Sequence, residues 1–111
     1  MVTRRIFTTA ASLAFAAMMG FSAPATAQTK QIVYMTPGLD LAFWRYVSEG
    51  VKSVAEKNGY GFAALDSTND PQTQLQNAQD AIARGVAGIV LSPTDSSTAP
   101  AILSLAKDAG I

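Results

Sequence analysis

Residues 31–35 read QIVYM, a short run of β-branched and aromatic side chains that ends at the turn Pro37-Gly38. This run predicts a β-strand. From Ala42 to Asn58, apolar side chains then recur at three- and four-residue spacing, which predicts an amphipathic helix. Gly59 is expected to end that helix, because glycine readily takes the left-handed conformation found past helix ends.

The same alternation continues along the chain. Further strands are predicted over Tyr60–Leu65 and Val86–Leu91, and a third helix over Ser97–Ala109. Asp70-Pro71 begins the second helix, since aspartate caps helices and proline suits their first position, and Arg84-Gly85 ends it. The apolar stripes of the helices are formed by Phe43, Val47, Val51, Val54 and Ala55 in the first, by Leu75, Ala78, Ile82 and Ala83 in the second, and by Ile102, Leu105, Ala106 and Ala109, which are expected to face in, in the third.

This βαβαβα order predicts an α/β fold, namely part of a doubly wound parallel sheet with helices on its faces. Ile111 resembles the first residue of a fourth strand. A three-stranded parallel sheet leaves apolar edges and helix faces uncovered, so residues 28–111 are expected to be a truncated N-terminal lobe of a larger protein.

Residues 1–27 have the order of a secretory signal peptide. Arg4 and Arg5 precede an uncharged apolar run from Ile6 to Phe21, and Ala25-Thr26-Ala27 supplies small residues for cleavage. The apolar run is short for a membrane span, which needs about 20 residues. The sequence therefore predicts export to the periplasm and a mature segment with six basic and eight acidic residues, a net charge of −2.

Composition narrows the possible functions. The 111 residues carry a formal net charge of +0, so nucleic-acid binding has no electrostatic support. The chain has no cysteine and no histidine, which excludes thiol or Ser-His catalysis and zinc sites built on those residues. It also lacks a dinucleotide-binding glycine motif, a P-loop and a nucleophile elbow. We expect no enzyme activity, no cofactor and no metal.

Ligands of open parallel sheets bind beyond the carboxyl ends of the strands, where the strand order reverses. With strands ordered 2-1-3, the loops at residues 36–41 and 92–96 would meet there. These loops and the adjacent helix start carry the candidate ligand-binding residues Asp40, Phe43, Trp44 and Asp95. Carboxylates accept strong hydrogen bonds from hydroxyls, and an aromatic face packs against the C–H face of a sugar ring.

Each of these residues also has a structural interpretation. Asp40 could cap the first helix instead of, or as well as, binding a ligand, and Asp95 is favoured as a cap or turn residue. Phe43 could pack in the core, whereas Trp44 is offset from the apolar stripe and favours a ligand or interdomain contact. Arg45 is expected at the solvated surface. The polar face of the second helix is predicted to hold Gln72, Gln74, Gln76, Asn77 and Gln79.

Several segments resemble the opening of ribose-type periplasmic binding proteins. They are residues 32–40 (IVYMTPGLD), Phe43-Trp44, Gly50, Ala55, Gly59-Tyr60, residues 65–71 (LDSTNDP), residues 76–80 (QNAQD) and residues 91–96 (LSPTDS). The resemblance implies two similar lobes that close over a sugar or related solute and then dock on a membrane permease. It also implies that Phe43 and Trp44 stack on the ligand and that a polar residue near Asp40 bonds to it.

The expected function is therefore solute binding for an ABC import system, with a sugar or polyol as solute and an inner-membrane permease as partner. The full-length protein is expected to be a monomer. The alternative is a periplasmic receptor of the same architecture that passes its liganded state to a signalling partner.

Overall fold

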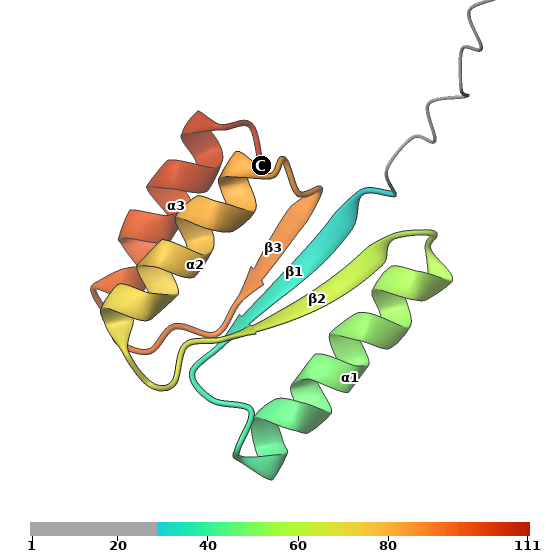
Figure 1. The fold of residues 1–111 in the computed structure, drawn as a ribbon, viewed down its shortest axis with the longest axis horizontal. Coiled ribbons are helices and arrows are strands. Elements are labelled where there is room, and N and C mark those ends of the chain that lie inside the picture. Colours follow the sequence, from blue (N-terminus) through green and yellow to red (C-terminus); the bar gives the residue numbers. More distant parts are fainter. Residues whose placement is uncertain (1–28) are drawn as a thin grey trace, which may run out of the picture.

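The structure is a computed structural model that describes residues 29–111. Its elements are β1 (Gln31–Thr36), α1 (Ala42–Lys57), β2 (Gly61–Asp66), α2 (Pro71–Ala83), β3 (Gly88–Leu91) and α3 (Thr98–Asp108) (Figure 1). This order confirms the predicted α/β alternation. The predicted signal peptide at residues 1–27 lies outside the described residues.

The three strands form one parallel sheet in the order β2-β1-β3, as expected. The central strand β1 pairs with β2 from Gln31 opposite Gly61 to Thr36 opposite Asp66. Its pairing with β3 is shorter, from Ile32 opposite Gly88 to Met35 opposite Leu91. The strand order therefore reverses at β1, and the carboxyl ends of all three strands lie at one edge of the sheet.

The third strand begins two residues later than predicted, at Gly88 rather than Val86. Val86 is buried, but its N–H bonds to the Ala81 carbonyl at 3.4 Å and so belongs to the turn after α2. An apolar residue that packs in the core without pairing is easily taken for part of a strand.

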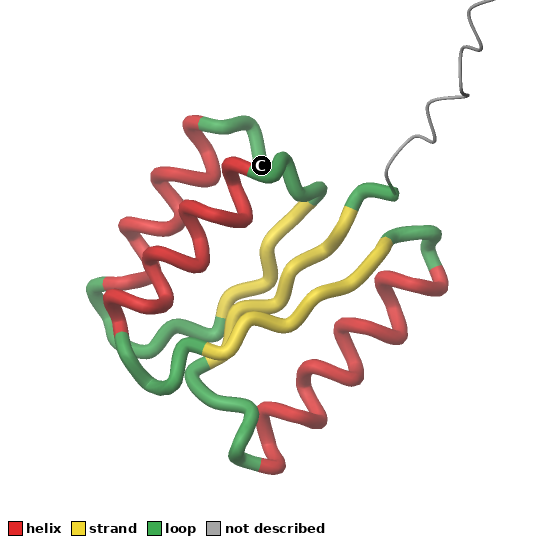
Figure 2. Tube along the Cα trace, in the orientation of Figure 1, coloured by secondary structure: helices red, strands yellow, loops and turns green. Residues whose placement is uncertain are grey.

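The helices lie on the two faces of the sheet. α1 packs against β2 and β1 on one face, while α2 and α3 lie side by side on the other (Figures 1 and 2). Right-handed crossovers between parallel strands produce this arrangement. The chain moves from β1 to β2 on one side of β1 and then passes back over β1 to form β3 on its other side, so α1 and α2 lie on opposite faces. No helix of residues 29–111 has both the length and the apolar character needed to cross a bilayer.

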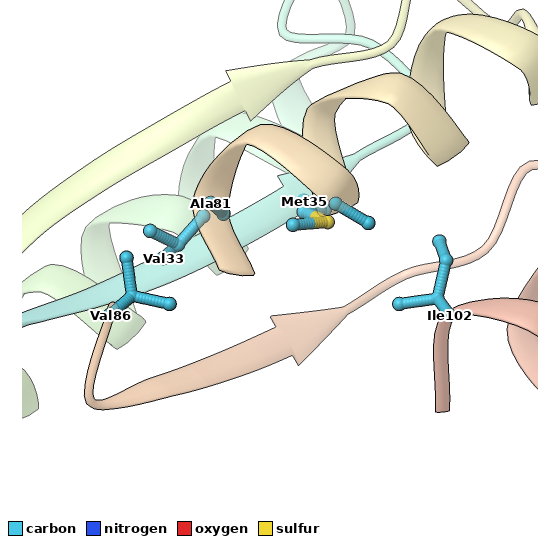
Figure 3. Packing of buried hydrophobic residues seen from close by; sticks show 6 residues of the cluster. Val33, Met35, Ala81, Val86 and Ile102 are labelled. Carbon is cyan, nitrogen blue, oxygen red and sulfur yellow. The ribbon is translucent and has the colours of Figure 1, made fainter. Parts of the chain in front are cut away.

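The core lies between the sheet and the α2–α3 layer. Val33 and Met35 point to this side because alternate residues of a strand share a face, and both are fully buried. They pack with Ala78, Ala81, Val86 and Ile102 (Figure 3).

The helix ends follow the predicted chemistry. The Asp70 side chain accepts hydrogen bonds from the backbone N–H groups of Gln72 and Thr73, and Pro71 occupies the first helical position of α2. Gly85, just after α2, has φ +69°, a conformation that side chains disfavour and glycine tolerates. The predicted start and end of α2 are thus confirmed.

The predicted buried faces of the helices were partly wrong. In α2 the buried residues are Gln74, Ala78 and Ala81, whereas Ala83 is exposed because it lies about 200° around the helix from Ala81. In α3 the buried residues include Ile102 and Ala106, but Ala109 follows the helix end and is exposed.

In α1 the correction is larger. The fully buried residues are Ser48 and Ala55, while Phe43 and Val54 are 64% and 63% exposed. Val51 and Val54 instead line an apolar groove of about 590 Å³ that also includes Ile32 and Val90 from the sheet. The apolar stripe of α1 was identified correctly, but α1 lies over β2 and β1, so the flank of the helix that faces β3 is left uncovered.

Candidate functional site

The candidate site lies at the carboxyl edge of the sheet. The β1–α1, β2–α2 and β3–α3 loops all leave the sheet at this edge (Figure 1). α1 and α3 cover opposite faces of the sheet (Figure 1). The start of α1, with Phe43 and Trp44, and the loop before α3, with Asp95, therefore belong to opposite faces. A ligand held by both groups would therefore sit across the strand ends rather than on a face of the sheet.

The loop after β1 is fixed mainly by the next βα loop. The Asp66 carboxylate accepts the Leu39 N–H through Oδ2 at 3.0 Å and the Thr68 N–H through Oδ1 at 2.7 Å. The Asn69 N–H bonds to the Pro37 carbonyl at 2.6 Å. Asp66 thus joins two loops, a role that the sequence analysis missed because the last residue of an apolar strand carries no distinctive pattern.

Asp40 is exposed and does not cap α1. The N-cap residue is Leu41, which makes no side-chain capping bond, so the capping alternative for Asp40 was wrong. The Asp40 carboxylate instead lies over Gly38, where an added Cβ would meet Asp40 Oδ1 at 2.5 Å. Because Gly38 has no side chain, the space is free for the Asp40 carboxylate.

Arg45 is exposed, as expected, but its side chain also bonds to the loop after β1. Its Nη1 donates to the Leu39 and Asp40 carbonyl oxygens, each at 3.1 Å. The guanidinium therefore closes the loop against the first turn of α1 and sets a positive charge beside Asp40.

The two aromatic residues form a pair in the first turn of α1. The rings of Phe43 and Trp44 meet edge to face, with centroids 4.8 Å apart and an interplanar angle of 75°. Phe43 is 64% exposed, so the core alternative for this residue was wrong, and Trp44 is half-buried. An exposed ring supported by a second ring is a preorganised apolar contact.

Asp95 is a turn residue, one of the two structural roles that the sequence favours: the N-cap of α3 is Ser97, and Asp95 lies two residues before it. Its Oδ1 accepts the backbone N–H groups of Ser97 and Thr98 at 2.9 Å and both hydroxyls at 2.7 Å. These bonds, above all those from the Thr98 and then the Ser97 hydroxyl, lower the pKa of Asp95 to about 2. Asp95 is therefore a firmly ionised carboxylate at the strand edge.

Gln74 was predicted on the polar face of α2, and this was wrong. Its side chain is fully buried and bonds to the β3–α3 loop, with Nε2 donating to the Ser92 carbonyl at 3.0 Å and Oε1 accepting the Thr94 N–H at 2.9 Å. On the other face, the Tyr34 and Ser92 hydroxyls lie 3.0 Å apart. Sequence alone offered no means of distinguishing Gln74 from its exposed neighbours.

Two other features bear on the chemistry of this edge. Within residues 29–111, no three side chains of the His, Cys, Asp or Glu type converge as metal ligands would. The apolar groove of α1 is a separate feature, because it reaches Asn58 and Tyr60 at the opposite end of the sheet. The candidate site thus offers carboxylates, backbone groups and an aromatic pair, which suit hydrogen bonding and stacking.

Comparison with known proteins places this geometry in context. The chain is 31% identical to the ribose import binding protein of Escherichia coli over 102 residues, which cover 91% of this chain and 34% of that protein. The ribose import binding protein of Haemophilus influenzae is 29% identical over 77% of this chain and 30% of its own length. The chain thus spans about a third of the length of the curated relatives it matches.

Solved structures agree. An ABC transporter solute-binding protein from Mycobacterium smegmatis with bound glycerol aligns with a TM-score of 0.68 and 25% identity, covering 75% of this chain and 29% of that one. A second, from Bacillus halodurans with bound myo-inositol, aligns with a TM-score of 0.66 and 28% identity over the same shares of the two chains. Residues 32–111 match the family described as the periplasmic binding protein domain. With its β2-β1-β3 sheet and its polar loops at the carboxyl edge, the chain belongs to the periplasmic binding protein domain family.

Proposed function

We propose that this chain forms one wall of a solute-binding site in the extracytoplasmic receptor of an ABC import system, and that the solute is a sugar or polyol. The observation that carries the proposal is that two loops leaving the carboxyl edge present an exposed aromatic pair, after β1, and a carboxylate held by backbone and hydroxyl bonds, Asp95 after β3. Relatives described as ribose import proteins, and similar structures holding glycerol and myo-inositol, support the same solute class.

Each residue has a distinct role in this proposal. The exposed face of Phe43 packs on the C–H face of the solute, and Trp44 supports the Phe43 ring from its edge. Asp40 accepts hydroxyl hydrogen bonds from one side of the edge. Asp95 uses Oδ1 for its bonds to Ser97 and Thr98, so Oδ2 is the oxygen available to a hydroxyl from the other side.

The mechanism requires binding without covalent chemistry, in keeping with a family of solute-binding proteins rather than enzymes. A solute that contacts this wall and a facing lobe stabilises the closed arrangement over the open one, and a membrane permease then recognises the closed form. Residues 1–27, with Arg4-Arg5 before an apolar run and Ala25-Thr26-Ala27 at its end, would direct export to the periplasm.

The emission of Trp44 offers a direct test, because it is the single tryptophan of the 111 residues. Because one wall cannot enclose a solute, binding to the chain alone should be weak, so ribose, glycerol and myo-inositol are titrated to high millimolar concentration into the chain and into a Phe43→Ala variant. We expect at least one of them to shift the emission, and the variant to bind that solute about five- to tenfold more weakly, in line with the value of one aromatic contact.

Tyr46→Ala is the matched control, because Tyr46 is an α1 aromatic that is 79% exposed and stands outside the pair. It should bind as the unmodified chain does. A screen in which no sugar or polyol perturbs Trp44, while a solute of another class such as an amino acid does, would refute the proposed solute class.

A further inference from the structure

The side chain of Gln74 links two elements that are not neighbours in sequence. It extends from α2 to the segment that follows β3, where its amide meets the Ser92 carbonyl at 3.0 Å and the Thr94 N–H at 2.9 Å. Gln74 is fully buried, so these bonds form away from water, where an unmade bond is costly.

The two backbone groups flank Pro93, which has no N–H of its own. A carbonyl at one residue and an N–H two residues later point the same way in an extended chain, and an adjacent strand would normally pair with both. The Gln74 amide supplies one acceptor and one donor in that arrangement. It therefore takes the place of a peptide group and continues the pairing of β3 past its last residue, Leu91.

Ser92 is also held from the sheet. Its N–H bonds to the Met35 carbonyl at 2.9 Å, and its hydroxyl lies 3.0 Å from that of Tyr34. Beyond Pro93, the hydroxyls of Thr94 and Thr98 lie 3.3 Å apart, and the Thr98 N–H bonds to Oδ1 of Asp95. The segment from Ser92 to Asp95 is thus fixed by β1 on one side and by Gln74 on the other.

We propose that Gln74 is a positioning residue for the solute site: its amide fixes the backbone of Ser92–Thr94 and so sets where the Asp95 carboxylate stands at the strand edge. The positioning role concerns this chain alone, while its consequence for binding rests on the proposed function. Glutamine is required because the position needs a donor and an acceptor on one planar group. Methionine supplies neither, and an ionised glutamate supplies no donor and buries a charge.

Amide hydrogen exchange on the 111-residue chain tests the positioning role without any ligand. Gln74→Met should raise the exchange rate of the Thr94 amide at least tenfold relative to amides of the β1 core. Gln76→Met is the matched control, because it makes the same change at an exposed position of the same helix, and Thr94 exchange should stay unchanged. Ala78→Gly serves as a destabilised control that accelerates core amides and Thr94 together.

Glutamate at the same position separates positioning from simple packing. In Gln74→Glu, a protonated carboxyl regains one donor and one acceptor, and burial raises the pKa of such a carboxyl above its usual value. Thr94 protection should therefore be retained at acid pH and lost as the pH rises and the group ionises. Unchanged Thr94 protection in Gln74→Met, or protection of Gln74→Glu that does not depend on pH, would overturn the positioning role.

Binding is measured separately, with ribose, glycerol and myo-inositol as probes and Trp44 emission as the readout. Gln74→Met should bind the active probe at least tenfold more weakly than Ala78→Gly of matched melting temperature. Equal affinities would show that Gln74 positions the loop without serving the solute. If no probe perturbs Trp44 of the unmodified chain even at high millimolar concentration, the proposed function fails, while the exchange result still decides the positioning role.

Discussion

Asp95 concentrates its hydrogen bonds on a single carboxylate oxygen. Two backbone N–H groups and two hydroxyls reach Oδ1, and the Thr98 hydroxyl contributes most to the low pKa of about 2. A carboxyl that is more acidic in the folded chain than its usual 3.8 stabilises the fold when ionised. That contribution is complete above about pH 4 and is lost as the pH falls toward about 2.

Replacement of Asp95 by asparagine should therefore make the free energy of unfolding depend less on pH in the acid range. Urea unfolding between about pH 5 and pH 2 is expected to show a smaller loss of stability for Asp95→Asn than for the unmodified chain, because the variant has no proton to gain at this position. Part of the loss should persist, since the pKa of Asp70 is also lowered, chiefly by the Thr73 hydroxyl.

Ser97→Ala provides a graded control, because it removes one hydroxyl donor and keeps the backbone N–H. Its loss of stability on acidification should be intermediate between that of the unmodified chain and that of Asp95→Asn. Identical pH dependence in all three proteins would mean that Oδ1 of Asp95 is not the acceptor described here.

The same residue shows what sequence could foresee at the site. Aspartate followed by two serines predicts a cap or turn residue from local chemistry, and the structure confirms the turn. The roles of Phe43 and Asp40 were harder to predict from sequence, because the choice between a structural and a ligand-binding role depended on which side of α1 faces the sheet. That orientation is set by packing between distant elements and leaves no local signal.

At the scale of the element, α3 illustrates how sharply a helix separates its faces. Ile102 is 1% exposed and packs into the core with Val33 and Met35, whereas the adjacent Leu103 is 64% exposed (Figure 3). Consecutive residues are about 100° apart around a helix, so one change of similar size can be made on each face.

Ile102→Ala should lower the free energy of unfolding by about 2–5 kcal/mol, the cost of a large-to-small change in a packed core. Leu103→Ala should change it by less than about 0.5 kcal/mol, as a surface substitution does. Urea denaturation of both variants measures the difference. Comparable losses of stability in the two variants would mean that Ile102 does not lie on the face of α3 that packs into the core.

The elements themselves were largely predictable, and the helix faces only in part. All three strands and all three helices lie where the periodicity put them, with ends shifted by no more than two residues. Gln74 shows the limit: its amide is buried because the backbone after β3 presents a carbonyl and an N–H around Pro93. Only the folded arrangement of α2 against β3 reveals that complementarity.

At the scale of the whole molecule, the two faces of the sheet are covered unequally. Two helices, α2 and α3, lie on one face and α1 alone on the other (Figure 2). Val33 and Met35 are completely buried on the first face, while Val90 on the second is 39% exposed. Val54 and Val90 therefore line an open apolar groove of about 590 Å³ beside β3. A hollow of this size and character suits an apolar molecule of modest size.

We expect the 111-residue chain to bind an anilinonaphthalene dye in this groove, with a rise in dye fluorescence. Val54→Lys should remove most of that rise, because a charge placed on the groove wall opposes an apolar guest. The matched control is Leu103→Lys, which adds the same charge at an apolar position of nearly equal exposure, 64% against 63%, outside the groove.

Circular dichroism should show that both variants keep the fold. If Leu103→Lys lowers dye binding as much as Val54→Lys does, the dye responds to net charge rather than to the groove. Dye binding that neither variant changes would instead show that the uncovered flank of α1 is not the apolar surface that the unmodified chain presents to solvent.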